Sequence, residues 1–175
     1  MVQRQLMEFL DKNKLLSKFQ FGFRPRLSTE LAATLLLDEI RKSVDQGKLE
    51  GATFIDLSKA FDTISHSNLL QKLPKYGIKE GELSWFTDYL FHRSAAVSYG
   101  KSSSKIADIQ TGVPQGSILG PLLFILFFND ITDVIVGAKI VKYADDTVIY
   151  VADKDLKAIK TKLSKRYGVY RRLVC

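Results

Sequence analysis

A pair of adjacent aspartates, Asp145 and Asp146, lies between two short β-prone runs. The runs, Lys139 to Tyr143 and Thr147 to Val151, are separated only by Ala144 and this pair, so the chain must reverse tightly there. Asp is a common turn former, and that ordinary role is one interpretation of the pair. Adjacent carboxylates repel each other, however, and a turn gains little from the second one. A divalent cation would remove the conflict, because hard metals are bound through oxygen ligands.

A third acidic residue, Asp56, lies in the apolar run Ala52 to Leu57, which the pattern predicts as a strand. An ionised carboxylate in such a run needs a partner or a metal. Taken alone, Asp56 is better explained as a strand-end cap on the next turn. Taken with the acidic hairpin, it suggests two neighbouring strands that bring carboxylates to one edge of a sheet. That arrangement could hold two cations roughly 3.5–4 Å apart.

Helical and β-prone segments alternate along the rest of the chain. Ser28 is the predicted N-cap of a helix that runs to about Gln46, with Gly47 as its stop. The buried face of this helix is expected to carry Leu31, Leu35, Leu36, Ile40 and Val44. Further helices are expected over residues 1–16, from Ser65, and over Leu83 to Leu90, Leu122 to Asp130 and Leu156 to Arg166, with a hairpin over Ala95 to Ile109. Strand pairs joined by tight turns favour an antiparallel sheet, so we expect the α+β class.

The composition is that of a globular chain, with 46% hydrophobic and 26% charged residues. Lys and Arg number 26 against 19 Asp and Glu, and the net charge of +7 suits a polyanionic partner without requiring one. The single cysteine, Cys175, excludes an internal disulfide framework and a cysteine-based zinc site. Neither a signal-peptide core nor a bilayer-spanning run is recognised, so we expect an intracellular protein (cytoplasm or nucleus) without a membrane partner.

Three segments in a fixed order resemble the reverse transcriptase domain of non-LTR (LINE-like) retrotransposons. They are Phe54 to Asp62 (FIDLSKAFD), Gly112 to Phe124 (GVPQGSILGPLLF) and Tyr143 to Asp146 (YADD). Gln20 to Arg24 (QFGFR) resembles the segment that precedes the first of these, and the match covers about residues 19 to 151. The resemblance implies a polymerase palm, an antiparallel sheet backed by helices, together with fingers.

The resemblance also implies roles for individual residues. Asp56, Asp145 and Asp146 would be catalytic and would bind two Mg²⁺ ions, or Mn²⁺ in their place, with the backbone carbonyl of Leu57 assisting. The implied nucleotide-binding residues are Phe61, Gln115, Gly116 and Tyr143. The ring of Phe61 would disfavour a ribose 2′-hydroxyl, and Tyr143 would lie beside the primer end. Arg24 is a candidate phosphate contact, although packing within its turn explains it about as well.

The implied reaction is RNA-directed DNA polymerisation, in which deoxynucleotides are transferred to a primer 3′-OH. The expected partners are an RNA or DNA template with its primer and deoxynucleoside triphosphates, and the oligomeric state is left open. We expect residues 1–50 to form partial fingers and entry helices and residues 51–175 to form the palm. The family's upstream fingers segment and its thumb are not recognised, so a truncated domain with the thumb absent is expected.

Two other functions remain open at this point. The chain could be a catalytically inactive retrotransposon remnant that acts at most as a nucleic-acid or protein binding module. A two-metal nuclease would share the carboxylates but would leave Phe61 and Gln115 without a role.

Two further groups of residues have ordinary interpretations beside functional ones. Asp62 and His66 lie four residues apart, and a local cap or hydrogen bond is favoured over a metal site. A cluster of basic residues near the C-terminus could follow a phosphate backbone or form a solvated helix face. It comprises Lys157, Lys160, Lys162, Lys165, Arg166, Arg171 and Arg172.

Overall fold

A three-stranded antiparallel sheet carries the acidic residues. In the computed structural model, which describes residues 1–174, its strands are β1 (Leu49–Ile55), β6 (Lys139–Tyr143) and β7 (Asp146–Asp153), in the order β1-β7-β6. The hairpin of β6 and β7 was predicted from the sequence and is confirmed. The predicted strand over residues 52–57 begins and ends earlier than expected, so that Asp56 and Leu57 follow the strand. The lone Cys175 lies outside the described residues.

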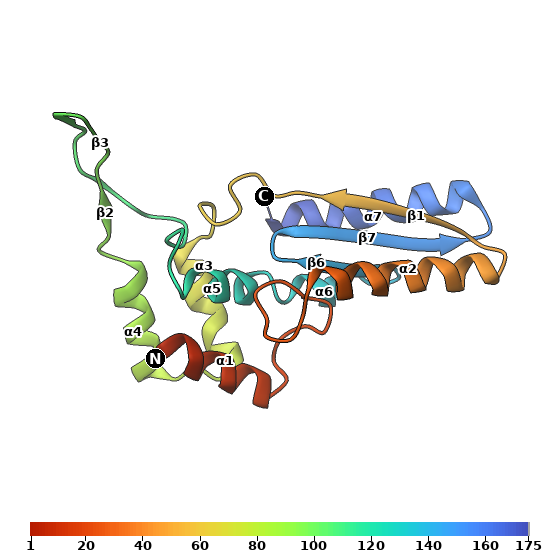
Figure 1. The fold of residues 1–175 in the computed structure, drawn as a ribbon, viewed down its shortest axis with the longest axis horizontal. Helices are drawn as coiled ribbons and strands as arrows, with labels where there is room; N and C mark the ends of the chain where they lie inside the picture. The colour runs from red at the N-terminus through yellow and green to blue at the C-terminus, as the bar shows by residue number, and fades with distance from the viewer. Residues whose placement is uncertain (175) are drawn as a thin grey trace. The chain divides into compact units, whose positions relative to one another are not determined.

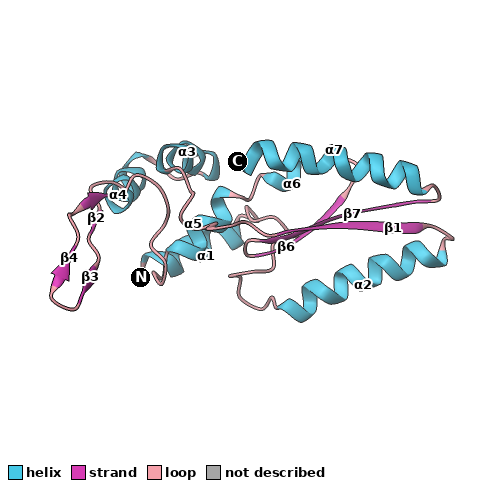
Figure 2. Ribbon diagram, turned by 90° about the horizontal axis from the view of Figure 1, so that it is seen from above, coloured by secondary structure: helices cyan, strands magenta, loops and turns pink. Residues whose placement is uncertain are grey.

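Two long helices cover opposite faces of this sheet, as Figure 2 shows. One is α2 (Thr29–Asp45) and the other is α7 (Leu156–Val174). On the α2 face, the side chains of Val141 and Tyr150 are buried in a cluster that includes residues of α2. On the other face α7 approaches closely, because a Cβ built on Gly51 of β1 would lie 2.4 Å from a side-chain carbon of Ile159.

The buried face of α2 differs from the one expected. The helix begins after Ser28, whose side chain accepts a hydrogen bond from the amide of Leu31, as predicted. Leu31 and Val44 are exposed, however, whereas Ala32 and Ser43 are buried. The prediction for Leu31 and Val44 was therefore wrong. The stripe that faces the sheet is rotated toward small residues, which let the helix lie close to the strands.

By packing, the described residues form two compact units. The sheet unit contains Leu16–Ser58 and the chain from Phe128 onward, including the short helix α6 (Ile131–Val134). The helical unit contains Met1–Leu15 and Lys59–Phe127. Its elements are α1 (Val2–Lys12), α3 (His66–Lys72), η1 (Leu73–Tyr76), α4 (Glu80–Leu90), α5 (Gly120–Phe127) and the short strands β2 (Ser94–Ala95), β3 (Ser98–Tyr99), β4 (Ser102–Ser103) and β5 (Ala107–Asp108). Figure 1 labels the α-helices of this unit and the strands β2 and β3.

The helix α5 forms the core of the helical unit. All residues from Leu122 to Leu126 are buried. The helix predicted over Leu122 to Asp130 is confirmed in part, because α5 begins at Gly120 and ends at Phe127. The C-terminal carbonyls of α5 are satisfied by side chains of neighbouring elements: Lys72 Nζ donates to the carbonyl of Phe127 (2.6 Å) and the Tyr76 hydroxyl donates to that of Leu126 (3.1 Å). The turn and hairpin over Ala95 to Ile109 form as predicted, as two short antiparallel ladders.

The α+β class expected from the sequence is confirmed by these two units. Among the described residues, the structure contains no helix that is both long enough and apolar enough to cross a membrane.

Candidate active site

The three acidic residues singled out in the sequence lie at one end of the sheet. Because β1 and β7 are antiparallel, the last residue of β1, Ile55, pairs with Thr147 near the start of β7. Asp56 follows Ile55 directly, and Asp146 precedes Thr147, so both residues come at this end of the sheet. Asp145 lies in the turn that joins β6 to β7. Figure 1 shows this turn and the end of β1 at the same end of the sheet.

These carboxylates are accessible to water. Asp56 and Asp146 are exposed and Asp145 is half-buried. In residues 1–174, no group of three or more His, Cys, Asp or Glu side chains is placed so that it could hold a metal ion. The chemistry of the donors nevertheless fits a hard cation, because carboxylates and backbone carbonyls, such as that of Leu57 next to Asp56, are the oxygen ligands that Mg²⁺ and Mn²⁺ take.

The turn between β6 and β7 has an unusual backbone. Tyr143 pairs with Asp146, which leaves Ala144 and Asp145 as the two turn residues. Ala144 has a φ of +57°, in the left-handed region that a residue with a Cβ rarely adopts. The side chain of Gln20, which is 1% exposed, forms hydrogen bonds with both the amide and the carbonyl of Ala144.

Gln20 was not among the residues to which the sequence assigned a role in the site. It appeared only as the first residue of a segment that resembles the family. The only local signal is a polar residue between Phe19 and Phe21, and such a residue can as easily be exposed as buried. Its partner is 124 residues away, so sequence spacing could not identify the contact.

Two other predicted site residues lie in the sheet unit. Tyr143 is half-buried and packs against the cluster that contains Phe21 and Tyr150. Arg24 Nη1 donates to the backbone carbonyl of Ser17 at 2.9 Å, so this nitrogen stabilises its own turn. The packing interpretation of Arg24 is supported, and its contact with a phosphate stays a prediction.

The remaining predicted residues belong to the helical unit, where two motif segments are joined. Gln115 Nε2 donates to a carboxylate oxygen of Asp62 at 2.9 Å. The backbone amide of Val113 donates to the carbonyl of Phe61 at 2.8 Å. Between these contacts, Gly112 (φ +87°) approaches Asp62 so closely that an added Cβ would lie 2.8 Å from its Cα. Only glycine fits this position.

The ring of Phe61 is held in a fixed place. It stacks on Phe124 of α5, with ring centroids 4.5 Å apart and an angle of 26° between the planes. Phe124 is fully buried and Phe61 is half-buried, so one face of the Phe61 ring is anchored by the core. Gly116 has a φ of +77° in the exposed turn after Gln115.

Asp62 and His66 do not form a pair. His66 is 1% exposed, and its Nε2 lies 2.7 Å from the carbonyl oxygen of Gly112, so the ring ties α3 to the loop before α5. Asp62 is bound to Gln115 instead. The expected local cap or hydrogen bond is therefore wrong for these two side chains, because both are bound to the distant segment that contains Gly112 and Gln115.

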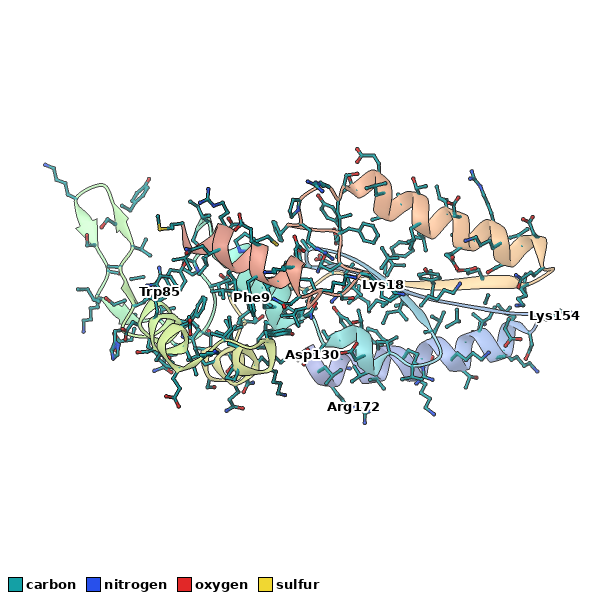
Figure 3. All side chains as sticks on the ribbon, turned by 90° about the horizontal axis from the view of Figure 1, so that it is seen from below. Phe9, Lys18, Trp85, Asp130, Lys154 and Arg172 are labelled. Carbon is teal, nitrogen blue, oxygen red and sulfur yellow. The ribbon has the colours of Figure 1, made fainter. Side chains whose placement is uncertain are left out.

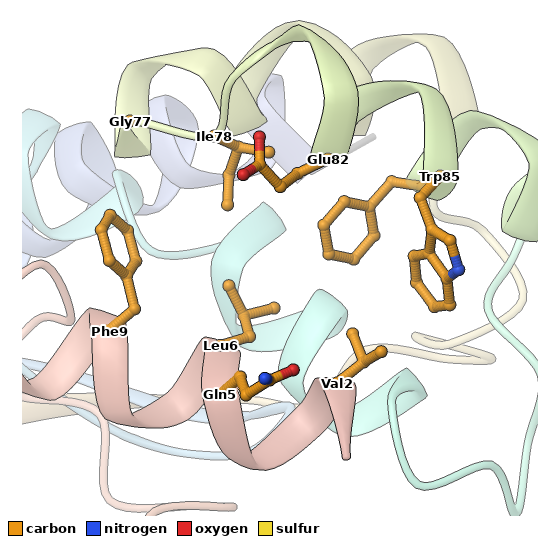
Figure 4. A pocket seen from close by; sticks show the side chains of 9 residues that line it. Val2, Gln5, Leu6, Phe9, Gly77, Ile78, Glu82 and Trp85 are labelled. Atoms are coloured by element: carbon orange, nitrogen blue, oxygen red, sulfur yellow. The ribbon is translucent and has the colours of Figure 1, made fainter.

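A cavity of about 410 Å³ in the helical unit lies between α1 and the segment from Gly77 to Phe86 (Figure 4). Its lining is mostly apolar, with Leu6, Phe9 and Trp85 among the residues. None of the motif residues lines it, so it is not part of the candidate active site.

The basic residues of α7 flank the other face of the sheet. Lys162 forms an ion pair with Asp153 at 2.6 Å, and the interaction holds the pKa of Asp153 below its ordinary value. Arg171 and Arg172 are exposed, and Figure 3 shows Arg172 extending outward from the helix. A solvated face describes these residues, and contact with a phosphate backbone stays a prediction.

Comparison with known proteins agrees with the motifs. The RNA-directed DNA polymerase from mobile element jockey of Drosophila melanogaster is 29% identical, over 98% of this chain and 19% of the relative. The retrovirus-related Pol polyprotein from type-1 retrotransposable element R2 of Popillia japonica is 35% identical, over 71% of this chain and 18% of the relative. The chain therefore spans less than a fifth of the length of these curated relatives.

A solved structure supports the fold. The telomerase of Candida tropicalis in complex with a TWJ fragment of telomeric RNA superposes with a TM-score of 0.66 and 14% identity, over 98% of this chain and 31% of that one. At this identity the likeness concerns the fold alone.

The resemblance predicted from the three ordered segments is confirmed by a family model described as reverse transcriptase (RNA-dependent DNA polymerase), which matches residues 1–171. On this match, the chain belongs to the reverse transcriptase family, that of the RNA-directed DNA polymerases.

Proposed function

We propose that this chain is a reverse transcriptase domain that transfers deoxynucleotides to a primer 3′-OH by a two-metal mechanism. The observation that carries the proposal is the register of β1 and β7, which leads Asp56 and the Asp145–Asp146 pair to the same end of the sheet. Membership of the reverse transcriptase family supports the choice of polymerisation over other reactions that use paired carboxylates.

Asp56, Asp145 and the Leu57 carbonyl would hold the divalent ions, and Asp146 would complete the acidic cluster. Mg²⁺ bound there, or Mn²⁺, would lower the pKa of the primer 3′-hydroxyl and stabilise the charge of the in-line phosphoryl transfer. The half-buried position of Asp145 and the accessible position of Asp56 are compatible with ligands that meet a nucleotide at the surface of the sheet.

The nucleotide would be selected by residues of the helical unit. The stacked ring of Phe61 would disfavour a ribose 2′-hydroxyl, and Gln115, oriented by Asp62, would contact the incoming nucleotide together with Gly116. Tyr143 would lie beside the primer end, and Arg24 would contact a phosphate. Within this proposal, residues 1–50 serve as partial fingers and entry helices and residues 51–175 as the palm.

Primer extension tests the proposal. Purified chain would be incubated with an RNA template, a DNA primer, deoxynucleoside triphosphates and Mg²⁺, beside Asp145→Asn and a control, Asp133→Asn. Asp133 is an exposed aspartate of α6 in the same unit. We expect extension by the wild type and the control, and a loss of about a thousandfold in Asp145→Asn, because a ligand of the charge-stabilising ions is removed. Equal extension by Asp145→Asn would refute the metal assignment.

One observation favours a second function, a binding module without catalysis. Within the described chain, the acidic side chains are not gathered into a group of three or more that could hold a metal. In the same experiment, wild-type chain that retains template binding in a filter or gel-shift assay but extends no primer would support this alternative.

A further inference from the structure

The side-chain amide of Gln20 forms two hydrogen bonds with the backbone of the turn that carries the acidic pair, as a neighbouring strand would. Gln20 Nε2 donates to the carbonyl of Ala144 at 3.2 Å, and the Ala144 amide donates to Gln20 Oε1 at 3.0 Å. Both polar groups of the Ala144 backbone are therefore bound by one side chain that is 1% exposed. A buried amide with this paired geometry is satisfied only while the turn keeps its shape.

Gln20 is itself fixed by the backbone around it. The amide of Phe21 donates to the carbonyl of Lys142, and the amide of Lys142 donates to the carbonyl of Phe19, both at 2.8 Å. This parallel bridge aligns the segment with the end of β6. The same Gln20 Oε1 also accepts a hydrogen bond from the amide of Gly22 at 2.9 Å. The side chain therefore has little freedom to leave Ala144.

Gly22 lets this segment come close enough for the contact. A Cβ at Gly22 would lie 2.1 Å from the amide nitrogen of Ala144, a distance that no side chain tolerates. The close approach of the Gln20–Gly22 backbone to the turn therefore requires glycine at position 22.

Ala144, the residue that Gln20 binds, has a disfavoured backbone conformation. Ala144 holds a φ of +57°, which is disfavoured for a residue with a Cβ, and it is followed at once by two adjacent carboxylates that repel each other. Both factors would favour a different turn if Ala144 were released. The direction in which Asp145 and Asp146 leave the turn depends on the conformation that Gln20 holds.

We propose that Gln20 is a positioning residue for Asp145 and Asp146, which sets the turn in the shape that binds a divalent ion. The inference rests on the proposed function, because it takes these carboxylates as metal ligands. A residue with a merely structural role would stabilise the fold without changing the affinity for metal. A positioning residue changes that affinity at equal stability, as partners of metal ligands do.

The decisive variant is Gln20→Met, which keeps the length of the side chain and removes its hydrogen bonds. Its matched control is Leu163→Ala, which loosens α7 at Gly51 in the same unit and leaves Gln20 and Ala144 unchanged. Amide hydrogen exchange followed by NMR should be about tenfold faster at Ala144 in Gln20→Met than in the control, because the acceptor of that amide is lost.

Affinity for Mn²⁺ is the second measurement, read from paramagnetic broadening of the Asp145 and Asp146 resonances in the full chain. We expect Gln20→Met to bind Mn²⁺ at least about tenfold more weakly than wild type, and Leu163→Ala to bind it like wild type. An unchanged affinity in Gln20→Met, with wild type binding normally, would overturn this inference alone. Wild-type chain without Mn²⁺ broadening at these residues would overturn the proposed metal site and this inference with it.

Gln20→Asn keeps the test decisive if Gln20→Met does not fold. Asparagine keeps an uncharged side-chain amide but is one methylene shorter, so it cannot reach both the amide and the carbonyl of Ala144 as Gln20 does. Exchange of the Ala144 amide should be faster, and Mn²⁺ should bind more weakly, than in wild type. Wild-type affinity in a folded Gln20→Asn variant would show that the paired contact does not position the carboxylates.

Discussion

The ring of Phe61 stacks on that of Phe124, with centroids 4.5 Å apart, so the implied sugar-selecting residue is anchored to the buried helix α5. The Phe61 ring can exclude a ribose 2′-hydroxyl only if it stays in place, and stacking on Phe124 restricts its movement. We expect Phe61→Ala to raise the ratio of ribonucleotide to deoxynucleotide incorporation by about tenfold, because one steric contact discriminates by at least that factor. Single-nucleotide primer extension measures the ratio of kcat/KM values.

The variant Phe124→Leu tests whether stacking on Phe124 contributes to sugar selection by Phe61. The substitution keeps an apolar side chain in the core but removes the stacking partner of Phe61. A smaller rise in ribonucleotide incorporation is expected than in Phe61→Ala. The assignment of Phe61 as the sugar-selecting residue fails if Phe61→Ala discriminates between the two sugars as well as wild type does.

The hydrogen bond from Gln115 to Asp62, 2.9 Å long, leads to a second prediction. Asp62→Ala leaves Gln115 without its orienting acceptor, so the KM for deoxynucleotides should rise about fivefold with kcat nearly unchanged, as expected for the loss of one hydrogen bond. Steady-state primer extension provides both constants.

The matched control for this prediction is Asp88→Ala, an exposed aspartate of α4 outside the motifs. The double variant Asp62→Ala with Gln115→Ala should be no worse than Gln115→Ala alone, because the two residues act through one contact. Additive losses in the double variant would show that Asp62 does not act through Gln115.

Much of the local structure could be predicted from the sequence because its signals are local. Ser28 and Ser65 each begin a helix with a side-chain hydrogen bond to an amide three residues on, the pattern that identifies an N-cap. The acidic hairpin was likewise determined by two β-prone runs and a short gap. The hairpin also places β6 beside β7, whereas no local signal indicates which of these two strands pairs with β1.

The contacts that organise the site could not be predicted in this way. Gln20 meets Ala144 across 124 positions, and Gln115 meets Asp62 across 53, with no periodicity to connect them. The buried face of α2 was misassigned because leucines occur around much of the helix, and packing against the sheet selected the stripe with Ala32 and Ser43. Tertiary packing decided these cases.

The buried hydroxyl of Tyr150 is expected to lower the stability of the folded protein at alkaline pH. Burial, assisted by the nearby carboxylates of Glu39 and Glu50, raises the pKa of Tyr150 to about 12 from its ordinary value of 10.0. Between these values the folded chain keeps a proton that the unfolded chain has released, so the free energy of unfolding falls as pH rises. The loss attributable to Tyr150 should be about 2 kcal/mol across the interval.

Urea unfolding of wild type and Tyr150→Phe at pH 8 and at pH 11.5 isolates this contribution, because other groups titrate alike in both proteins. The stability of the variant should fall less steeply than that of wild type. Parallel losses in the two proteins would contradict the assignment to Tyr150.

The close contact between β1 and α7 leads to a last prediction, tested by two glycines of the same unit. A Cβ at Gly51 would lie 2.4 Å from a carbon of Ile159, whereas a Cβ at Gly168 in α7 would meet nothing within 4 Å. Gly51→Ala should therefore lower the free energy of unfolding by about 1–3 kcal/mol through overpacking. Gly168→Ala should raise it by about 0.5–1 kcal/mol, because alanine favours the helix. Urea unfolding monitored by circular dichroism measures both values, and a Gly51→Ala variant as stable as wild type would show that α7 does not press on the strand at this point.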